Sequence, residues 1–186
     1  MRNNRGVTLV ELLVVISIIA ILAVALGFTY QGWQGSFKVE NAVKQLHADL
    51  MTARTLAMST KVAYIVDFPT ATSYEIRTWN DTNSDGKIDA AEITGLPAFP
   101  VPKTLQYPVP AGIVGVLYIF DQQGLISSGN LGNPPVLIDP ENPPVIINPP
   151  VKIFLTSTNT PDYDCITMSQ SRINIGLMAA GVCNAK

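Results

Sequence analysis

The sequence predicts an α+β fold in which one long N-terminal helix packs on an antiparallel β-sheet. Three observations lead to this fold class. Residues 12–28 form an almost unbroken apolar run, residues 39–57 repeat apolar side chains at helical spacing, and short runs rich in β-branched and aromatic residues follow. The chain has 186 residues, which is enough for one domain of ordinary size.

The composition excludes several classes of protein. Charged residues make up 14% of the chain, and the formal net charge is -2. So few charges argue against a disordered chain, and the near-neutral balance offers nucleic acid no general attraction. One His without a Ser or Cys nucleophile context supplies no catalytic triad, and no phosphate-binding Gly-rich motif occurs. We therefore do not expect an enzyme.

Glu11 is the only charged side chain between Val7 and Phe37. A helix through this apolar run reaches about 30 Å, the thickness of the hydrocarbon core of a bilayer. The preceding residues 1–6 carry two Arg and no acid, so the positive-inside rule places them in the cytoplasm. The sequence thus predicts a single-pass anchor over residues 7–30 and an extracytoplasmic domain over residues 31–186.

An ordinary secretory signal is the alternative, because Ala23-Val24-Ala25 fits a small-x-small cleavage site. Glu11 argues against it, since a carboxylate costs roughly 2.5–3.5 kcal/mol at the centre of a membrane helix and gives a signal peptide no benefit. An ionisable residue in such a segment marks a functional site instead.

The stretch from Gly6 to Ile16 resembles the prepilin motif of type IV pilins and type II secretion pseudopilins. In that family a membrane peptidase cuts after the Gly and methylates the new amine, and Glu is the fifth mature residue. The resemblance implies that residues 1–6 are a leader, that cleavage occurs between Gly6 and Val7, and that Glu11 acts in assembly. It also implies prepilin peptidase, other pilin subunits and, before assembly, inner-membrane lipid as partners. The finished filament would lie in the periplasm or at the cell surface.

The chemistry of Glu11 fits this resemblance. Cleavage would create an α-amine on Val7 that is mostly cationic at neutral pH, since such amines have a pKa of about 7.7–8.0. A buried carboxylate and a buried amine neutralise each other, whereas either alone is costly. The expected partner is the amine of a neighbouring subunit; the alternative is a Glu that snorkels to the surface in a monomeric anchor. Phe28 stands where major pilins of the family usually carry Pro, which weighs against the main filament subunit.

The helix is expected to continue to about residue 60, although Gly32 and Gly35 lower its propensity by roughly 1 kcal/mol each and are expected to loosen it. One apolar stripe marks the face that packs on the sheet: Val39, Val43, Leu46, Leu50, Ala53 and Ala57.

Alternating runs at 62–68 and 73–79, separated by Pro69 and residues 70–72, predict a hairpin. Further strands are expected at 115–120, 151–156, 164–168 and 172–177. The helical Ala53 to Ala57 stretch leading into the first strand, and the late Ser-x-Ser-Arg-Ile-Asn-Ile run, are similar to minor pseudopilins of the GspH/FimT type. Asn-Pro-Pro-Val recurs three times within 133–151, which predicts an exposed loop or, alternatively, a proline motif read by a partner.

Residues 81–92 match the EF-hand calcium loop at every fixed position. In such a loop, side-chain oxygens at positions 1, 3 and 5 converge on the ion, and the Gly at position 6, here Gly86, permits the sharp turn. Position 7 offers its carbonyl, position 9 often acts through water, and position 12 binds through both carboxylate oxygens. The alternative is a polar hairpin tip whose acids are merely solvated. The ligand set expected for a structural calcium ion is Asp81, Asn83, Asp85, Lys87, Asp89 and Glu92.

The two cysteines, Cys165 and Cys183, are expected to pair, because an exported domain folds in an oxidising compartment. The family commonly carries such a C-terminal bridge, and its contribution is about 3 kcal/mol by the loop-entropy estimate.

The sequence therefore predicts a minor pseudopilin or pilin subunit. A DNA-binding minor pilin of an uptake system is the alternative, but the C-terminal third offers only Lys152, Arg172 and Lys186 as basic residues. Nucleic acid is for that reason not the expected partner.

Overall fold

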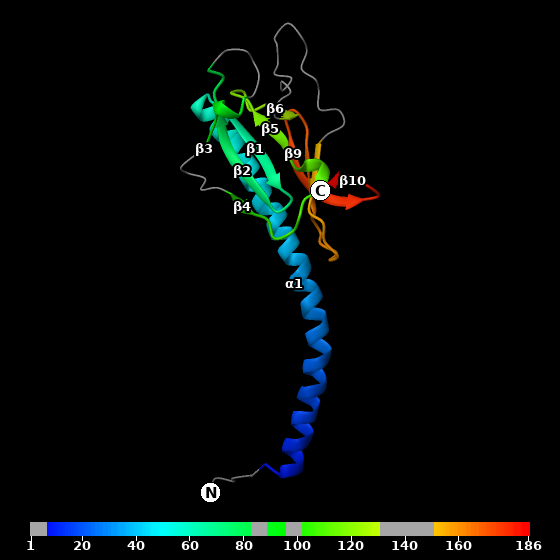
Figure 1. Ribbon diagram of the computed structural model, residues 1–186. Helices are drawn as coiled ribbons and strands as arrows, with labels where there is room; N and C mark the ends of the chain where they lie inside the picture. The colour runs from blue at the N-terminus through cyan, green and yellow to red at the C-terminus, as the bar shows by residue number, and fades with distance from the viewer. Residues whose placement is uncertain (1–6, 83–88, 96–101, 131–150) are drawn as a thin grey trace.

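The computed structural model describes residues 7–82, 89–95, 102–130 and 151–186 and confirms the α+β fold class. One helix, α1 (Leu9–Thr60), extends from the globular part as a long stalk, and its C-terminal half lies along the strands (Figure 1). The helix runs through Gly32 and Gly35 without a break, although both glycines lower its propensity. It ends where Lys61 adopts a left-handed φ of 58° and its N–H donates to the Ala57 carbonyl at 3.1 Å.

The strands form two antiparallel sheets rather than the single sheet expected. The larger sheet has the order β3-β2-β1-β5-β6, with β4 also paired to β2, and the smaller has the order β10-β9-β8-β7. The Ile126 N–H donates to the Gln170 carbonyl at 2.8 Å and so joins the two sheets. The strands are β1 (Ala63–Thr70), β2 (Ser73–Trp79), β3 (Ile93–Gly95), β4 (Lys103–Thr104), β5 (Val116–Phe120), β6 (Ile126–Asn130), β7 (Val151–Phe154), β8 (Cys165–Met168), β9 (Ile173–Ala179) and β10 (Val182–Ala185).

The predicted hairpin is present as β1 and β2, but its turn is shorter than expected. The strands pair from Ala63 with Trp79 to Asp67 with Glu75, and the register then shifts before Thr70 pairs with Ser73. Pro69, which was expected in the loop, lies inside β1 at this irregularity. It is tolerated there because a residue without an N–H interrupts a ladder least where the pairing is already broken. The predicted Asn-Pro-Pro-Val repeats lie largely outside the described residues.

The apolar stripe of α1 forms the centre of the core, as predicted. Its six members are each at most 1% exposed, and they pack against side chains of both sheets. Burying a side chain such as Leu46 or Leu50 contributes roughly 1.5–3 kcal/mol. The helix therefore holds the two sheets together through one continuous core, which includes Val66, Phe68, Tyr118, Ile153, Ile166 and Met168.

A disulfide joins Cys165 in β8 to Cys183 in β10 and so spans the intervening strand β9. Gly176 of β9 pairs with Cys165 on one side and with Ala185 on the other. A Cβ added at Gly176 would lie 2.2 Å from the backbone oxygen of Asn184, so no side chain fits between these strands.

We expect Gly176→Ala to lower the free energy of unfolding by about 1–3 kcal/mol, because β10 must move away from β9 to admit the methyl group. Urea denaturation of the full chain in detergent measures this effect. Gly112→Ala is the matched control, since nothing lies within 4 Å of a Cβ there. Equal midpoints for the two variants would show that β10 adjusts without cost.

Candidate functional site

The N-terminal end of α1 is built by a side chain that the sequence analysis did not single out. Thr8 has an extended backbone (φ −80°, ψ 152°), and its Oγ1 accepts the backbone N–H of Glu11 at 3.2 Å. Thr8 is therefore the N-cap, and Glu11 stands three residues later in the first turn, as in a capping box. In the sequence, this helix start is indicated by the Thr-x-x-Glu spacing directly before the apolar run. Gly6 lies outside the described residues, and Val7 precedes the cap.

Glu11 thus has a local role beside the one expected in assembly. A carboxylate in the first turn interacts favourably with the positive end of the helix dipole, by about 0.3–1 kcal/mol at an exposed site. The side chain of Glu11 is exposed, and the helical surface around it is otherwise apolar. Thr8 and Glu11 together place Val7 outside the helix, one residue before the cap.

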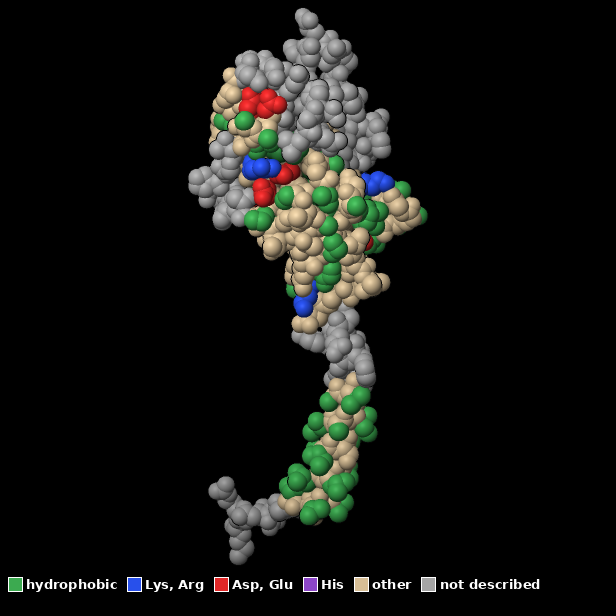
Figure 2. Space-filling model, viewed as in Figure 1, with side chains coloured by type: hydrophobic (Ala, Val, Ile, Leu, Met, Phe, Trp, Pro, Cys, Tyr) green, Lys and Arg blue, Asp and Glu red, His purple; other side chains and the backbone are tan. Residues whose placement is uncertain are grey.

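The surface around Glu11 is hydrophobic on all sides of the helix. Every side chain from Val7 to Val24 is exposed, including Leu9 at 78% and Ile21 at 71%. Figure 2 shows hydrophobic side chains around this part of the stalk, well away from the globular domain. In the described part of the chain, no helix reaches both the length and the hydropathy of a membrane span.

The predicted calcium ligands lie where β2 leads into β3. Asn83, Asp85 and Lys87 fall outside the described residues, so the structure does not test whether the six ligands converge. The ends of the loop are held together, because the Asn80 N–H donates to the Glu92 carbonyl at 3.3 Å. Asp81 and Glu92 therefore lie near the base of a hairpin, consistent with strands rather than helices flanking the loop.

Glu92 is a buried carboxylate with donors on both of its oxygens. It is 7% exposed, its Oε2 accepts Trp79 Nε1–H at 3.2 Å, and its Oε1 accepts the N–H and the hydroxyl of Thr82 at 2.9 and 3.0 Å. Bidentate binding of an ion would require at least the Thr82 contacts to rearrange. Among the described residues, no three Asp, Glu, His or Cys side chains are grouped to hold a metal.

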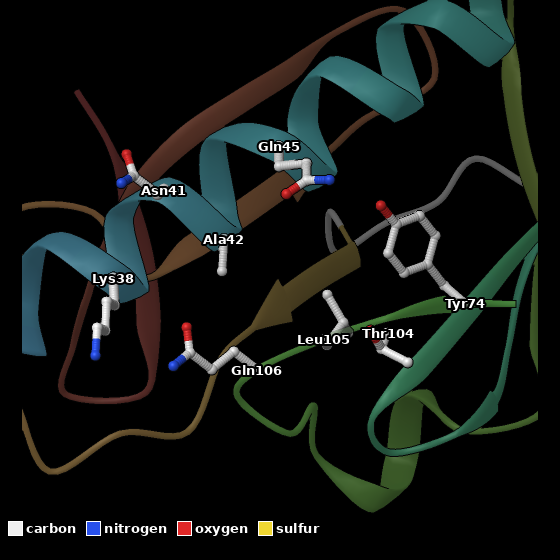
Figure 3. Close-up of a pocket in the computed structure, with 8 residues that line it drawn as sticks. All are labelled: Lys38, Asn41, Ala42, Gln45, Tyr74, Thr104, Leu105 and Gln106. Atoms are coloured by element: carbon white, nitrogen blue, oxygen red, sulfur yellow. The ribbon is translucent and has the colours of Figure 1, made fainter.

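A polar crevice of about 210 Å³ lies between α1 and the segment after β4 (Figure 3). Next to it, the Tyr74 hydroxyl points to α1 and donates to Asp49, which also receives Lys103 Nζ at 2.8 Å. Burial, then the hydrogen bond and the charge of Asp49, raise the pKa of Tyr74 above its usual range, so the hydroxyl stays protonated. The bonds of Tyr74 and Lys103 to Asp49 attach β2 and β4 to the helix.

The crevice itself is smaller than the roughly 300–1,000 Å³ that is typical of ligand pockets.

Comparison with known families agrees with the N-terminal geometry. Residues 1–27 match the family model described as the prokaryotic N-terminal methylation motif. A comparison with characterised proteins and with solved structures found no match. The motif is that of structural rather than enzymatic proteins, and over these N-terminal residues it indicates a precursor of the type IV pilin-like kind.

Proposed function

We propose that the chain is a minor pseudopilin or pilin subunit of the GspH/FimT type, assembled through its N-terminal helix into a type II secretion pseudopilus or a type IV pilus. The observation that carries this proposal is the combination of the methylation motif with a capped helix whose apolar surface bears the single carboxylate of Glu11. The same helix continues into a domain in which it packs on two β-sheets.

The proposed precursor crosses the inner membrane once. Residues 1–6 remain in the cytoplasm, residues 7–30 form the anchor, and residues 31–186 lie in the periplasm. The exposed apolar side chains of Val7 to Val24 support this arrangement, because such a surface is stable only in lipid or against other helices. Assembly would exchange lipid for the helices of neighbouring subunits.

Within the filament, Glu11 would neutralise the α-amine of Val7 in a neighbouring subunit. The cap geometry supports an intermolecular pair, because Val7 lies outside the helix and is free of the helical hydrogen-bond ladder. A paired charge fixes axial register, since a shifted neighbour would leave the carboxylate buried alone.

Binding of DNA is less well supported. Lys44, Arg77, Lys103 and Lys186 each form an ion pair with a neighbouring carboxylate, with nitrogen–oxygen distances of 2.7–3.5 Å. Basic side chains held in this way are poorly placed to replace the counterions of a phosphate backbone.

We also propose that residues 81–92 bind a structural calcium ion. The donor set supports it, because carboxylate, amide and carbonyl oxygens at these positions are those a hard cation prefers. The ion would draw Glu92 away from Thr82 and tie the loop to the end of β2. Asp81, Asn83, Asp85, Lys87, Asp89 and Glu92 would hold it.

Processing gives the direct test of the proposed function. Intact mass spectrometry of the protein from its native membrane should show loss of Met1 to Gly6, with or without one added methyl group. The same protein with Gly6 replaced, Gly6→Leu, should keep its leader, because the peptidase of the family cuts after Gly. A mature chain that begins at Leu26 would contradict the proposal and support an ordinary signal peptide.

A further inference from the structure

Two aromatic side chains lie on the surface of α1 where the helix leaves the globular domain. The rings of Trp33 and Phe37 stack with their centroids 5.8 Å apart and their planes 22° from parallel. Trp33 is 65% exposed and Phe37 is 48% exposed. Large apolar side chains exposed next to each other mark an interaction surface more often than isolated ones do.

These rings form one wall of a recess of about 660 Å³. The opposite wall is the connection between β7 and β8, which hangs lowest of the globular domain beside α1 (Figure 1). Gly35 allows this close approach, because a Cβ there would lie 2.5 Å from Oδ1 of Asn159. The recess therefore has an aromatic wall from the helix and a hydroxyl and amide wall from Thr158, Asn159 and Thr160.

The recess is also lined by two acidic side chains, and each of them forms an ion pair with a lysine. Glu40 lies 3.3 Å from Lys44, and Asp162 lies 3.5 Å from Lys186. The recess thus combines aromatic, hydroxyl and amide groups with balanced charges, which suits a ligand that is polar, partly apolar and neutral overall.

The position along the helix indicates what this ligand is. At 1.5 Å per residue, Trp33 lies about 36 Å beyond Leu9. The hydrocarbon core is about 30 Å thick, and the bilayer with both headgroup layers about 40–45 Å. A helix that enters the core near Leu9 therefore places Trp33 in the outer headgroup layer, where Trp side chains are enriched.

We propose that this recess seats the headgroup and glycerol region of a zwitterionic phospholipid of the outer leaflet. Trp33 faces the lipid in the headgroup layer, and Phe37, about 6 Å further along the helix, stacks on Trp33 from the aqueous side. The hydroxyls of Thr158 and Thr160 and the amide oxygen of Asn159 bond the headgroup. The bound lipid holds the domain at a fixed height above the membrane until the subunit leaves the bilayer and enters the filament. A neighbouring apolar helix fits the recess less well, because it would cover the hydroxyls of Thr158 and Thr160 and the amide oxygen of Asn159 with groups that cannot hydrogen-bond. The inference rests on the proposed membrane anchor.

Tryptophan fluorescence in vesicles of phosphatidylcholine and phosphatidylethanolamine tests the proposal. The full chain is reconstituted with lipids brominated either near the carboxyl end or near the methyl end of the acyl chain. The chain has two Trp, and Trp79 is only 7% exposed, so the difference between wild type and Trp33→Phe isolates Trp33. We expect the shallow bromines to quench Trp33 about twofold more than the deep ones, without any need for anionic lipid.

An internal reporter separates this inference from the anchor itself. Ile19→Trp in the Trp33→Phe protein places a ring about 21 Å closer to the cytoplasm, and we expect the deep bromines to quench it more strongly. If the deep bromines quench Ile19→Trp but neither brominated lipid quenches Trp33, the lipid site is overturned and the membrane anchor stands. Trp33 that is shielded from both lipid and aqueous iodide would instead be covered by another subunit, which also overturns the site. If neither reporter is quenched by lipid, the anchor fails, and the lipid site fails with it.

The polar wall has its own test. Thr158→Cys supplies one free thiol, since Cys165 and Cys183 are joined in the disulfide. A polarity-sensitive dye on this thiol should shift to shorter wavelength when vesicles are added. The same dye on Ser59→Cys, an exposed position at the other end of α1, should not shift. Equal responses at the two positions would overturn the placement of the recess at the membrane.

Discussion

Glu11→Leu is expected to reduce incorporation of the subunit into filaments more than about a hundredfold, while insertion and leader cleavage continue. The variant removes a costly carboxylate from the membrane segment, so the precursor should insert at least as well. In the filament, the amine of the neighbouring Val7 would be left buried without its counter-charge. Breaking a buried ion pair in this way costs about 3–5 kcal/mol. Sheared filaments, compared with membranes by immunoblot, measure the effect.

Two further variants separate assembly from the local role of Glu11 in the helix cap. Gln occupies the third position of a capping box as Glu does, so Glu11→Gln keeps a polar side chain there and removes the charge. The dipole attraction lost with that charge, about 0.3–1 kcal/mol, is too small to cause a hundredfold loss of assembly. Glu11→Gln should fail to assemble as Glu11→Leu does. Ser17→Leu is the matched control, because Ser17 already donates to the Leu13 carbonyl at 2.8 Å and needs no partner from another subunit. Normal assembly of Glu11→Gln would assign the effect to the cap and contradict the proposed charge pair.

The second large effect concerns calcium and Glu92. The full chain in detergent should unfold at a higher temperature in millimolar calcium than in chelator. Binding to the folded state alone contributes about 2.7 kcal/mol when the ion is at a hundredfold excess over its Kd. Asp85→Asn should remove most of this difference and leave the melting temperature in chelator unchanged. Magnesium should substitute poorly, because it prefers six-coordinate geometry and keeps its waters.

Glu92→Ala should behave differently from Asp85→Asn. It removes a ligand of the ion, but it also leaves the buried Trp79 N–H and the Thr82 donors without their acceptor. A buried donor without a partner costs about 1–3 kcal/mol, so this variant should melt lower even in chelator. Wild-type melting curves that are the same in calcium and in chelator would leave the loop as a solvated turn, with Glu92 a purely structural residue.

Several features were missed because short strands carry little signal of their own. β6 has the sequence Ile-Ser-Ser-Gly-Asn, whose composition favours a turn more than a strand. It becomes a strand because β5 pairs with it over its whole length. β10 follows a two-residue turn in which Ala180 and Gly181 have φ of 49° and 77°, and Ala-Gly is a weaker hairpin signal than Asn-Gly.

Gly35 and Glu92 show why single residues were interpreted incompletely. The glycine appeared to weaken the helix, yet its missing side chain admits Asn159 of a loop more than a hundred positions away. The loop spacing presented Glu92 only as a cation ligand, yet the fold buries it beside Trp79. In both cases the decisive contact comes from a different element, which no local pattern reports.

The sequence by itself determined the long helix, its buried stripe and the α+β fold class, and its first residues carry the methylation motif. These features depend on residues a few positions apart, and their period can be read along the chain. Only the tertiary structure decided that the strands divide into two sheets, that the disulfide spans β9, and that Thr158 to Thr160 face Trp33 and Phe37. The division into two sheets and the contact of Thr158 to Thr160 with Trp33 and Phe37 join segments distant in sequence, and α1 brings them together because its surface buries both sheets at once. The disulfide closes only 18 residues, but the strand that it spans is set by the pairing of β8, β9 and β10.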